Sequence, residues 1–285
     1  MNLSLLPTEQ DIAFYRENGY WISSKIFSDE ELAEIRTHHA QVIEGQYETG
    51  RTPHYNSHTP GTPLNQMIKI DNSHWADAVI ARTVIHPVIG NMAAMLSGSK
   101  GIRLWHDQLL YKPSQNAGTG AVGWHQDHHY WQCATPFNML TAWIALVDVN
   151  EQNGCMEVVP GSHNWGLLNN NDFFEHDLDT LQKRIEAETG KPFRPVACPL
   201  PAGAVSFHHC RVLHGSRPNL SMAPRLSLVA HLMPDGTCYK ANTPSDPHMN
   251  VRLLSGRDGD PFAGPYFPML WHESGTGNPW EVSMD

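Results

Sequence analysis

The stretch GWHQDHHYW, residues 123–131, places an imidazole and a carboxylate two positions apart, at His125 and Asp127. Side chains at alternate positions of a β-strand point to the same face, so on a strand these two groups would converge on one point. They offer one nitrogen and one oxygen ligand, and a second histidine would complete a two-histidine, one-carboxylate metal site. Such a tripeptide also arises by chance, and a hydrogen-bonded polar pair on a strand is the alternative interpretation.

A candidate for the second histidine is His214, in the segment RVLHGSRPN, because it follows a strand-like run and precedes a Gly-Ser turn. His208 and His209 are rivals for the same role. Only His214 has both the turn and, eleven residues later, an arginine at the start of another strand-like segment. We therefore favour His214 over the other two.

That arginine, Arg225, begins the segment RLSLVAHL, and Ser227 lies on the same face of the expected strand by the period of two. An inward-pointing arginine needs an anionic partner, because an unpaired buried charge is costly. A dicarboxylate co-substrate would supply one, through a bidentate contact with the guanidinium and a hydrogen bond from the serine hydroxyl. The alternative is an ion pair on the surface.

The segments around these motifs predict a barrel. Strand-like runs separated by Gly, Pro and Asn cover residues 102–111, 139–149, 155–160, 204–209 and 225–234. The residues before them read as helical, with capping signals at Thr8 and at Ser28, which is followed by Glu31. This order predicts an α+β fold, a double-stranded β-helix (a jelly-roll or cupin-like barrel) with N-terminal flanking helices.

We expect one domain over residues 1–285, because no repeat or linker-like run divides the chain. It would comprise a helical lead-in (1–100), a barrel core (101–234) and a loop-rich tail (235–285). The tail is rich in Gly and Pro and carries scattered aromatic residues, which favours ordered loop over a further domain.

Composition and charge narrow the class of protein. The chain has 19 Lys and Arg against 29 Asp and Glu, a net charge of −10, which argues against nucleic acid as a partner. The sequence lacks a run of about 18 apolar residues and the order of a signal peptide, so we expect no membrane span and a cytoplasmic location. Five widely spaced cysteines fit reduced thiols better than a disulfide framework. The oligomeric state is left open.

Taken together, the motifs resemble those of the phytanoyl-CoA dioxygenase family of Fe(II)/2-oxoglutarate-dependent oxygenases. They are His125-x-Asp127, NGCMEVVPGSH (153–163), HGSRPN (214–219) and Arg225-x-Ser227. The resemblance runs from about Lys69 to Pro234. It implies that His125, Asp127 and His214 hold Fe(II), and that Arg225 and Ser227 bind the far carboxylate of 2-oxoglutarate.

The resemblance also implies contacts between the co-substrate and three further residues: Trp143, Gln108 and Lys69. Trp143 stands eighteen residues after the first histidine, where the family has a tryptophan. Gln108 lies four positions before a Lys-Pro pair, where the family often has methionine, so this residue departs from the pattern.

The activity implied is the hydroxylation of a C–H bond in a small-molecule substrate, using O2 and releasing succinate and CO2. His129, Tyr130 and Trp131 follow the H-x-D motif and are expected to contact the substrate. A coenzyme A thioester would need several cations for its phosphates, and the chain has few. Two alternatives come from other classes: a cupin-like metalloenzyme that does not use 2-oxoglutarate, and a non-catalytic relative that binds a ligand.

Overall fold

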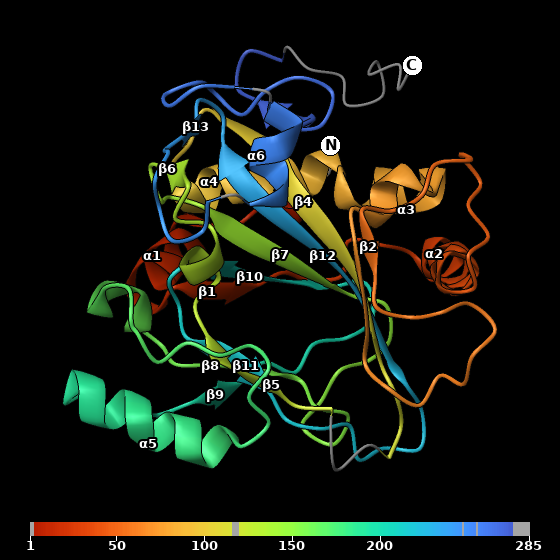
Figure 1. The fold of residues 1–285 in the computed structure, drawn as a ribbon, viewed down its shortest axis with the longest axis horizontal. Coiled ribbons are helices and arrows are strands. Elements are labelled where there is room, and N and C mark those ends of the chain that lie inside the picture. The colour runs from red at the N-terminus through yellow and green to blue at the C-terminus, as the bar shows by residue number, and fades with distance from the viewer. Residues whose placement is uncertain (1–2, 116–119, 247, 255, 276–285) are drawn as a thin grey trace.

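Two antiparallel sheets form the frame of the molecule in a computed structural model that describes residues 3–115, 120–246, 248–254 and 256–275. The large sheet contains, in spatial order, β1 (Tyr20–Ile22), β10 (Val205–His209), β7 (Leu140–Ala145), β12 (Arg225–Pro234), β4 (Gly101–Lys112), β3 (Ile68–Asp71) and β2 (Tyr55–Asn56), and β14 (Met269–His272) also pairs with β4. The small sheet contains β5 (Val122–His125), β11 (His214–Ser216), β8 (Met156–Val158) and β9 (Val196–Ala197), and a separate ribbon pairs β13 (Cys238–Tyr239) with β6 (Ala134–Thr135). Figure 1 shows the small sheet below the long strands of the large one.

Helices precede the barrel and pack on the large sheet (Figure 1). They are α1 (Glu9–Asn18), α2 (Asp29–Ile43), α3 (Ala78–Val84) and α4 (Pro87–Ser97), while α5 (Leu178–Thr189) lies beside the small sheet and α6 (Met249–Leu254) follows the barrel. Short 3-10 turns occupy Leu3–Leu5, Ser73–Trp75, Asp127–Tyr130 and Ser162–Trp165. The capping signals act as predicted, since Thr8 and Ser28 each form a capping box at the start of α1 and α2. The predicted α+β barrel with flanking helices is confirmed.

Strand β12 shows how the sequence separates the core from the pocket. Leu228 and Ala230 belong to the hydrophobic core that also contains residues of α3 and α4. Arg225, Val229 and His231 alternate with them and line a pocket on the opposite face. Because side chains on a strand alternate between faces, one strand serves both the core and the site.

The structure shows elements that we did not expect in two of the predicted parts, the lead-in and the tail. The lead-in is not purely helical, because β1, β2 and β3 all lie before residue 100 and join the large sheet. The tail is not only loop, because β14 pairs with β4 and α6 lies within it. These strands span two to four residues, too few to show a period of two, and long-range pairing with β4 and β10 holds three of them in place.

A further difference concerns the motif His125-x-Asp127, which we expect on a single strand. Strand β5 ends at His125, and Asp127 already begins a 3-10 turn. Gln126 between them keeps an extended backbone, with φ −115° and ψ 123°. The two side chains therefore still reach the same side, as an uninterrupted strand would have arranged them.

Residues 78–97 are long and apolar enough to cross a membrane, with a mean hydropathy of 1.4. In the structure they form α3 and α4, which are separated before Pro87, and 67% of the stretch is buried. Proline interrupts a helix because it lacks a backbone N–H and clashes with the preceding turn. We therefore assign this stretch to the core.

Gly123 in β5 permits a loop to run directly beside the metal-site motif. A Cβ atom at this position would lie 1.9 Å from the carbonyl oxygen of Asp172. The Gly123 N–H donates to the carbonyl of Phe173 at 3.0 Å. Only glycine allows this approach of two backbones, so the sequence at 123 also positions the loop that contains Phe173.

The strand added by the tail should matter for stability. Leu270 in β14 is 1% exposed and belongs to the main core. Replacing a buried leucine with alanine leaves a cavity, so Leu270→Ala should lower the free energy of unfolding by about 2–5 kcal/mol in urea denaturation. Leu220→Ala, at a site that is 59% exposed, is the matched control and should change it by less than about 0.5 kcal/mol. Equal values for both variants would contradict the placement of β14 in the core.

Candidate metal centre and binding pocket

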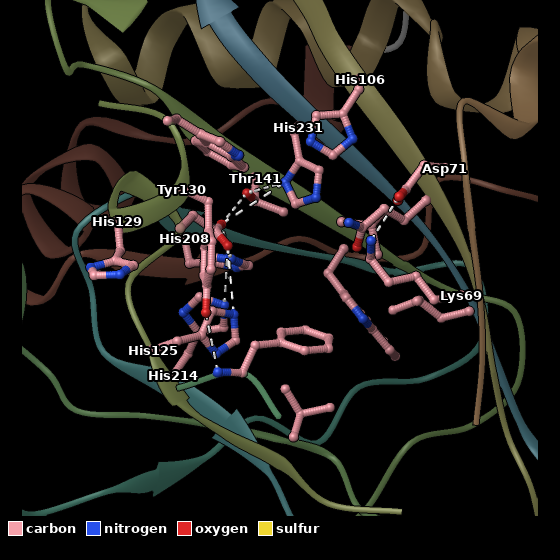
Figure 2. Close-up of a pocket in the computed structure, with 18 of the residues that line it drawn as sticks. Lys69, Asp71, His106, His125, His129, Tyr130, Thr141, His208, His214 and His231 are labelled. Atoms are coloured by element: carbon pink, nitrogen blue, oxygen red, sulfur yellow. Dashed lines mark hydrogen bonds and ion pairs between the residues drawn. The ribbon is translucent and has the colours of Figure 1, made fainter. Parts of the chain in front are cut away.

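A pocket of about 640 Å³ opens between the two sheets (Figure 2). Its lining is rich in imidazoles: His106, His125, His129, His208, His214, His231 and His248. Aromatic rings of Tyr130, Trp131, Trp143 and Phe173 also face it. Arg225 and Lys69 are the only arginine or lysine side chains among the described residues of the lining.

The structure brings His125, Asp127 and His214 together. One ligand atom from each lies within 4.8 Å of the others, and all three residues are buried. Nε2 of His125 lies 3.6 Å from Oδ1 of Asp127, and Nε2 of His214 lies 3.7 Å from the same oxygen. The three atoms therefore converge on one point, as the ligands of a two-histidine, one-carboxylate metal site do.

Backbone carbonyls orient both imidazoles of this cluster. Nδ1 of His125 is bonded to the carbonyl of Gly123 at 2.8 Å, and Nδ1 of His214 to that of Val212 at 3.1 Å. A carbonyl only accepts, so each Nδ1 carries the proton and each Nε2 presents a lone pair. Burial, and then the neighbouring imidazoles of His125 and His208, lower the pKa of His214 well below its usual value. His214 is thus neutral and ready to bind a metal.

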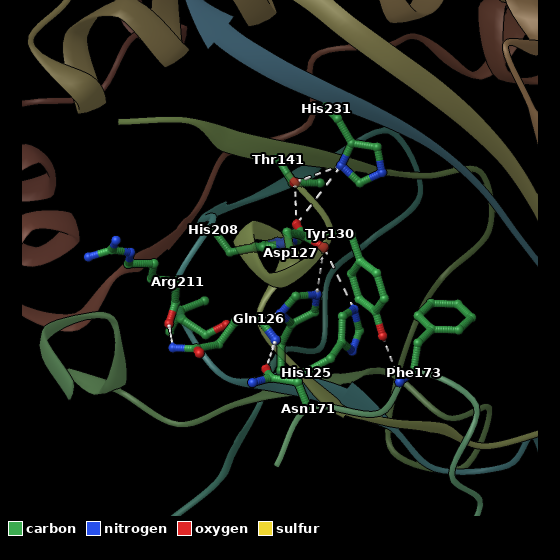
Figure 3. Close-up of polar contacts among 12 residues, drawn as sticks. His125, Gln126, Asp127, Tyr130, Thr141, Asn171, Phe173, His208, Arg211 and His231 are labelled. Atoms are coloured by element: carbon green, nitrogen blue, oxygen red, sulfur yellow. Dashed lines mark hydrogen bonds and ion pairs between the residues drawn. The ribbon is translucent and has the colours of Figure 1, made fainter. Parts of the chain in front are cut away.

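The second oxygen of Asp127 is held from the other side (Figure 3). The hydroxyl of Thr141 donates to Oδ2 at 2.7 Å, and Nε2 of His208 lies 3.2 Å from it. Burial alone would raise the pKa of Asp127, but its polar neighbours, with the hydrogen bond to His208 among them, outweigh burial and keep this pKa well below its usual range. The carboxylate is therefore ionised and has one oxygen free for a metal.

The two rival histidines occupy different places. His208 contacts Asp127 through Oδ2, on the oxygen turned away from His125 and His214, so it supports the carboxylate instead of joining the cluster. His209 does not line the pocket, and its ring lies 5.4 Å from that of His163. The geometry thus favours His214, as the sequence did.

Arg225 lies in the pocket at 3% exposure without a carboxylate partner among the described residues. Its Nη1 donates to the carbonyl of Gly154, and its Nε has no hydrogen-bond partner. Burial lowers the pKa of Arg225 to about 10, so the guanidinium stays charged at neutral pH. A buried cation with an unused donor indicates that an anion belongs beside it.

A second buried cation lies next to Arg225. Lys112 is 1% exposed, faces Arg225 in the β4–β12 register, and its Nζ donates to the Ser216 hydroxyl and to the carbonyl of Arg217, both at 2.7 Å. Burial, and then the positive charge of Arg225, lower the pKa of Lys112 well below its usual value. None of the described residues places a carboxylate beside Arg225, so the charge of its guanidinium makes this end of the pocket electropositive.

The other residues expected at the co-substrate differ in their placement. Trp143 lines the pocket, with its ring 5.2 Å from the Arg225 guanidinium, and Gln108 lines it as well. Lys69 also lines it, but its Nζ is engaged with Asp71 at 2.8 Å. Ser227 is fully buried on the same strand face as Arg225 with an unpartnered hydroxyl, yet it is not part of the lining.

All three residues expected at the substrate line the pocket: His129, Tyr130 and Trp131. Tyr130 has a further contact, since its hydroxyl oxygen accepts from the backbone N–H of Phe173 at 3.2 Å. The Phe173 ring in turn lies 5.1 Å from that of His125. Tyr130 thus helps to hold the Phe173 ring beside His125 of the cluster.

Gln126, between the two ligand candidates, anchors the same loop (Figure 3). Its side-chain oxygen accepts from Leu168, its amide donates to the carbonyls of Gly166 and Arg211, and its backbone N–H donates to Asn171. The residue is fully buried. The loop and the metal-site motif are therefore locked together by satisfied hydrogen bonds.

Four pocket residues were missed by the sequence analysis although a signal was present. Three stand two positions from an expected residue, namely Asp71, His106 and Thr141, and the fourth, His231, stands four positions from one. One step of two positions leads from Lys69 to Asp71, from Gln108 to His106 and from Trp143 to Thr141. Two such steps lead from Ser227 to His231.

Removing one ligand candidate should weaken metal binding. His214→Ala deletes one of three ligands, so we expect loss of Mn(II) affinity by at least tenfold in titration calorimetry, with the fold retained in circular dichroism. His209→Ala removes a neighbouring half-buried imidazole outside the pocket and should bind Mn(II) like the wild type. Unchanged Mn(II) binding in the His214 variant would contradict this cluster.

Comparison with known proteins agrees with this geometry. The family model described as Phytanoyl-CoA dioxygenase (PhyH) matches residues 15–227. The probable alpha-ketoglutarate-dependent hypophosphite dioxygenase of Stutzerimonas stutzeri is 28% identical over 223 residues, covering 75% of this chain and 74% of that protein. Ectoine dioxygenase of Bordetella bronchiseptica is 26% identical over 233 residues, covering 75% and 71%.

Solved structures agree as well. The epimerase SnoN from nogalamycin biosynthesis, in complex with Fe3+, alpha ketoglutarate and nogalamycin RO, matches with a TM-score of 0.71 at 26% identity, over 92% of this chain and 98% of that chain. The carbocyclase SnoK from the same biosynthesis matches with a TM-score of 0.71 at 27% identity, over 92% and 96%. With the family model matching well over half of its length, the chain belongs to the phytanoyl-CoA dioxygenase family of Fe(II)/2-oxoglutarate-dependent oxygenases.

Proposed function

We propose that this enzyme hydroxylates a C–H bond of a small-molecule substrate, with Fe(II) on His125, Asp127 and His214 and 2-oxoglutarate held by Arg225. The observation that carries the proposal is the pairing of two features in one pocket: a convergent His-Asp-His cluster and a buried arginine without a carboxylate. A metal site alone would suit many enzymes. The buried cation beside it adds the requirement for an anionic co-substrate.

The residues present fit both groups. Nε2 of each ligand histidine presents a lone pair and Asp127 presents a free oxygen, the donor set that suits Fe(II). The unpartnered Nε of Arg225 provides a donor for a carboxylate of 2-oxoglutarate. When bound, Fe(II) with 2-oxoglutarate and O2 supplies the oxidation that converts C–H to C–OH, while 2-oxoglutarate becomes succinate and CO2.

The protein positions the reactants and excludes water. Trp143 restrains the Arg225 guanidinium by lying against it. Thr141 and His208 fix the orientation of Asp127, and Phe173 shields His125 from solvent. A covered, preorganised site of this kind directs oxidation to the substrate and limits side reactions.

Charge in the pocket favours a substrate that is not carried on coenzyme A. Of the two described cations in the lining, Lys69 is engaged with Asp71, and we assign Arg225 to the co-substrate. Few cations therefore remain for phosphate groups. The cupin-like alternative without 2-oxoglutarate leaves the buried charge of Arg225 unexplained.

Arg225→Ala tests the co-substrate site. A hydrogen bond to a charged group contributes about 1.5–3 kcal/mol, so 2-oxoglutarate should bind at least about tenfold more weakly to the Mn(II)-loaded variant in calorimetry. Mn(II) affinity should stay the same, since Arg225 is not part of the ligand cluster. Arg217→Ala, at an exposed arginine paired with Glu157, is the control. A joint loss of both affinities would make Arg225 a folding residue.

Slow turnover of 2-oxoglutarate without a substrate tests the activity itself. Because the pocket holds the residues for both Fe(II) and the keto acid, we expect succinate to form when the protein is mixed with Fe(II), 2-oxoglutarate, ascorbate and air, as followed by NMR. Addition of a correct substrate should accelerate the reaction. His125→Ala is the control, and equal succinate release by both proteins under every compound tried would favour the non-catalytic alternative.

A further inference from the structure

Hydrogen bonds around Asp127 determine where the protons lie in three side chains (Figure 3). Thr141 Oγ lies 2.7 Å from Oδ2 of Asp127 and 2.8 Å from Nδ1 of His231. An ionised carboxylate only accepts hydrogen bonds, so the single hydroxyl proton of Thr141 must point to Asp127. The Thr141 oxygen is then left to accept, and Nδ1 of His231 must be the donor.

His231 is consequently held in the tautomer with the proton on Nδ1, and its Nε2 carries a lone pair. The side chain lines the pocket, and none of the described residues hydrogen-bonds to Nε2. The side chain is 5% exposed and no described carboxylate contacts Nε2, which favours a neutral ring. Nε2 is therefore a bare acceptor available to a bound molecule.

Neighbouring rings fix the direction of this acceptor. Trp131 meets His231 edge to face, with ring centroids 4.7 Å apart. His106 stands directly opposite on β4, with its ring centroid 4.4 Å from that of His231. Nδ1 of His231 lies 3.9 Å from Oδ2 of Asp127, and His231 lines the same pocket as the His-Asp-His cluster, so a group bound at Nε2 shares the pocket with the metal centre.

Most polar side chains around His231 already have a partner. Burial is the main cause that lowers the pKa of His106 well below its usual value and that of His248 to about 4, so both imidazoles are neutral. Lys69 is paired with Asp71, and the Asp246 carboxylate accepts from the Tyr239 hydroxyl at 2.7 Å. Nε2 of His231 therefore remains as an acceptor for a hydrogen-bonding group of a bound molecule.

We propose that the substrate carries a hydroxyl or amide N–H that donates to Nε2 of His231, and that this bond orients the substrate in the pocket. The inference rests on the proposed function, because it names the substrate class of the same site. His231 is thus a specificity-determining residue. A site built to accept a hydrogen bond rejects an analogue that lacks the donor, because its own acceptor is then left unpaired.

Nitrogen NMR of histidine-labelled protein loaded with Zn(II) and 2-oxoglutarate tests the tautomer without turnover. The His231 signals, assigned by their loss in His231→Asn, should show a protonated Nδ1 and a bare Nε2. Thr141→Val removes the hydroxyl that fixes the tautomer and should shift the population towards Nε2–H. A wild-type ring protonated on Nε2 would overturn the proposal.

Matched probes test the donor requirement on the same sample. Cyclohexanol and phenol can donate, whereas methoxycyclohexane and anisole have similar rings and cannot. We expect each alcohol to move the His231 Nε2 signal and to bind about two- to tenfold more tightly than its ether, the range for one neutral hydrogen bond. An Nε2 signal that responds equally to alcohol and ether, or to neither, would overturn the proposal.

Two substitutions separate the two ends of the imidazole. His231→Asn keeps an amide near Nδ1 for Thr141 but removes the acceptor that faces the pocket, so the preference for alcohol should disappear. His231→Gln places an amide oxygen near Nε2 and should restore part of it. His209→Asn, outside the pocket, is the control. Retained alcohol preference in His231→Asn would contradict the proposal, whereas failure of 2-oxoglutarate to bind any of these proteins would count against the proposed function instead.

Discussion

Side chains from both sheets converge on the carboxylate of Asp127. One oxygen faces His125 and His214 from the small sheet, and the other is held by Thr141 and His208 from the large sheet. Each imidazole and hydroxyl around it is itself fixed by a backbone carbonyl, a strand register or a further ring. An ionised carboxylate in a buried site is costly unless it is satisfied in this way, so the barrel and the metal centre have to be built together.

A second energetic cost, the burial of a positive charge, lies at the Arg225 end of the pocket. The charged guanidinium of Arg225 lies beside the buried amine of Lys112, with no described carboxylate between them. Such a pair destabilises the protein until an anion arrives, and the anion in turn gains a strong, directional contact. The pocket therefore has two unlike ends. The His-Asp-His cluster at one end favours a metal cation, and Arg225 at the other end favours an anion. In the proposed function, this asymmetry would give 2-oxoglutarate one orientation, with one end at the metal and the other at Arg225.

Much of the site could be predicted because strand periodicity is readable over long strands. Arg225 was found on a segment long enough to show alternation, whereas Trp143 was implied by the family resemblance. The rule of alternation, carried further, reaches His231 and Thr141. The rest depends on contacts between distant segments that no local pattern records. The support of Asp127 by His208 comes from strand pairing, Phe173 reaches the metal cluster through a loop, and β14 is only four residues long.

The central prediction for this site is which atoms bind the metal. A crystal structure of the protein soaked anaerobically with Fe(II) and 2-oxoglutarate is its most direct test. We predict iron bound to Nε2 of His125 and His214 and to one oxygen of Asp127, with the other oxygen still on Thr141 and the far carboxylate of the keto acid on Arg225. Iron on His208 in place of His214, or a keto acid bound away from Arg225, would contradict it.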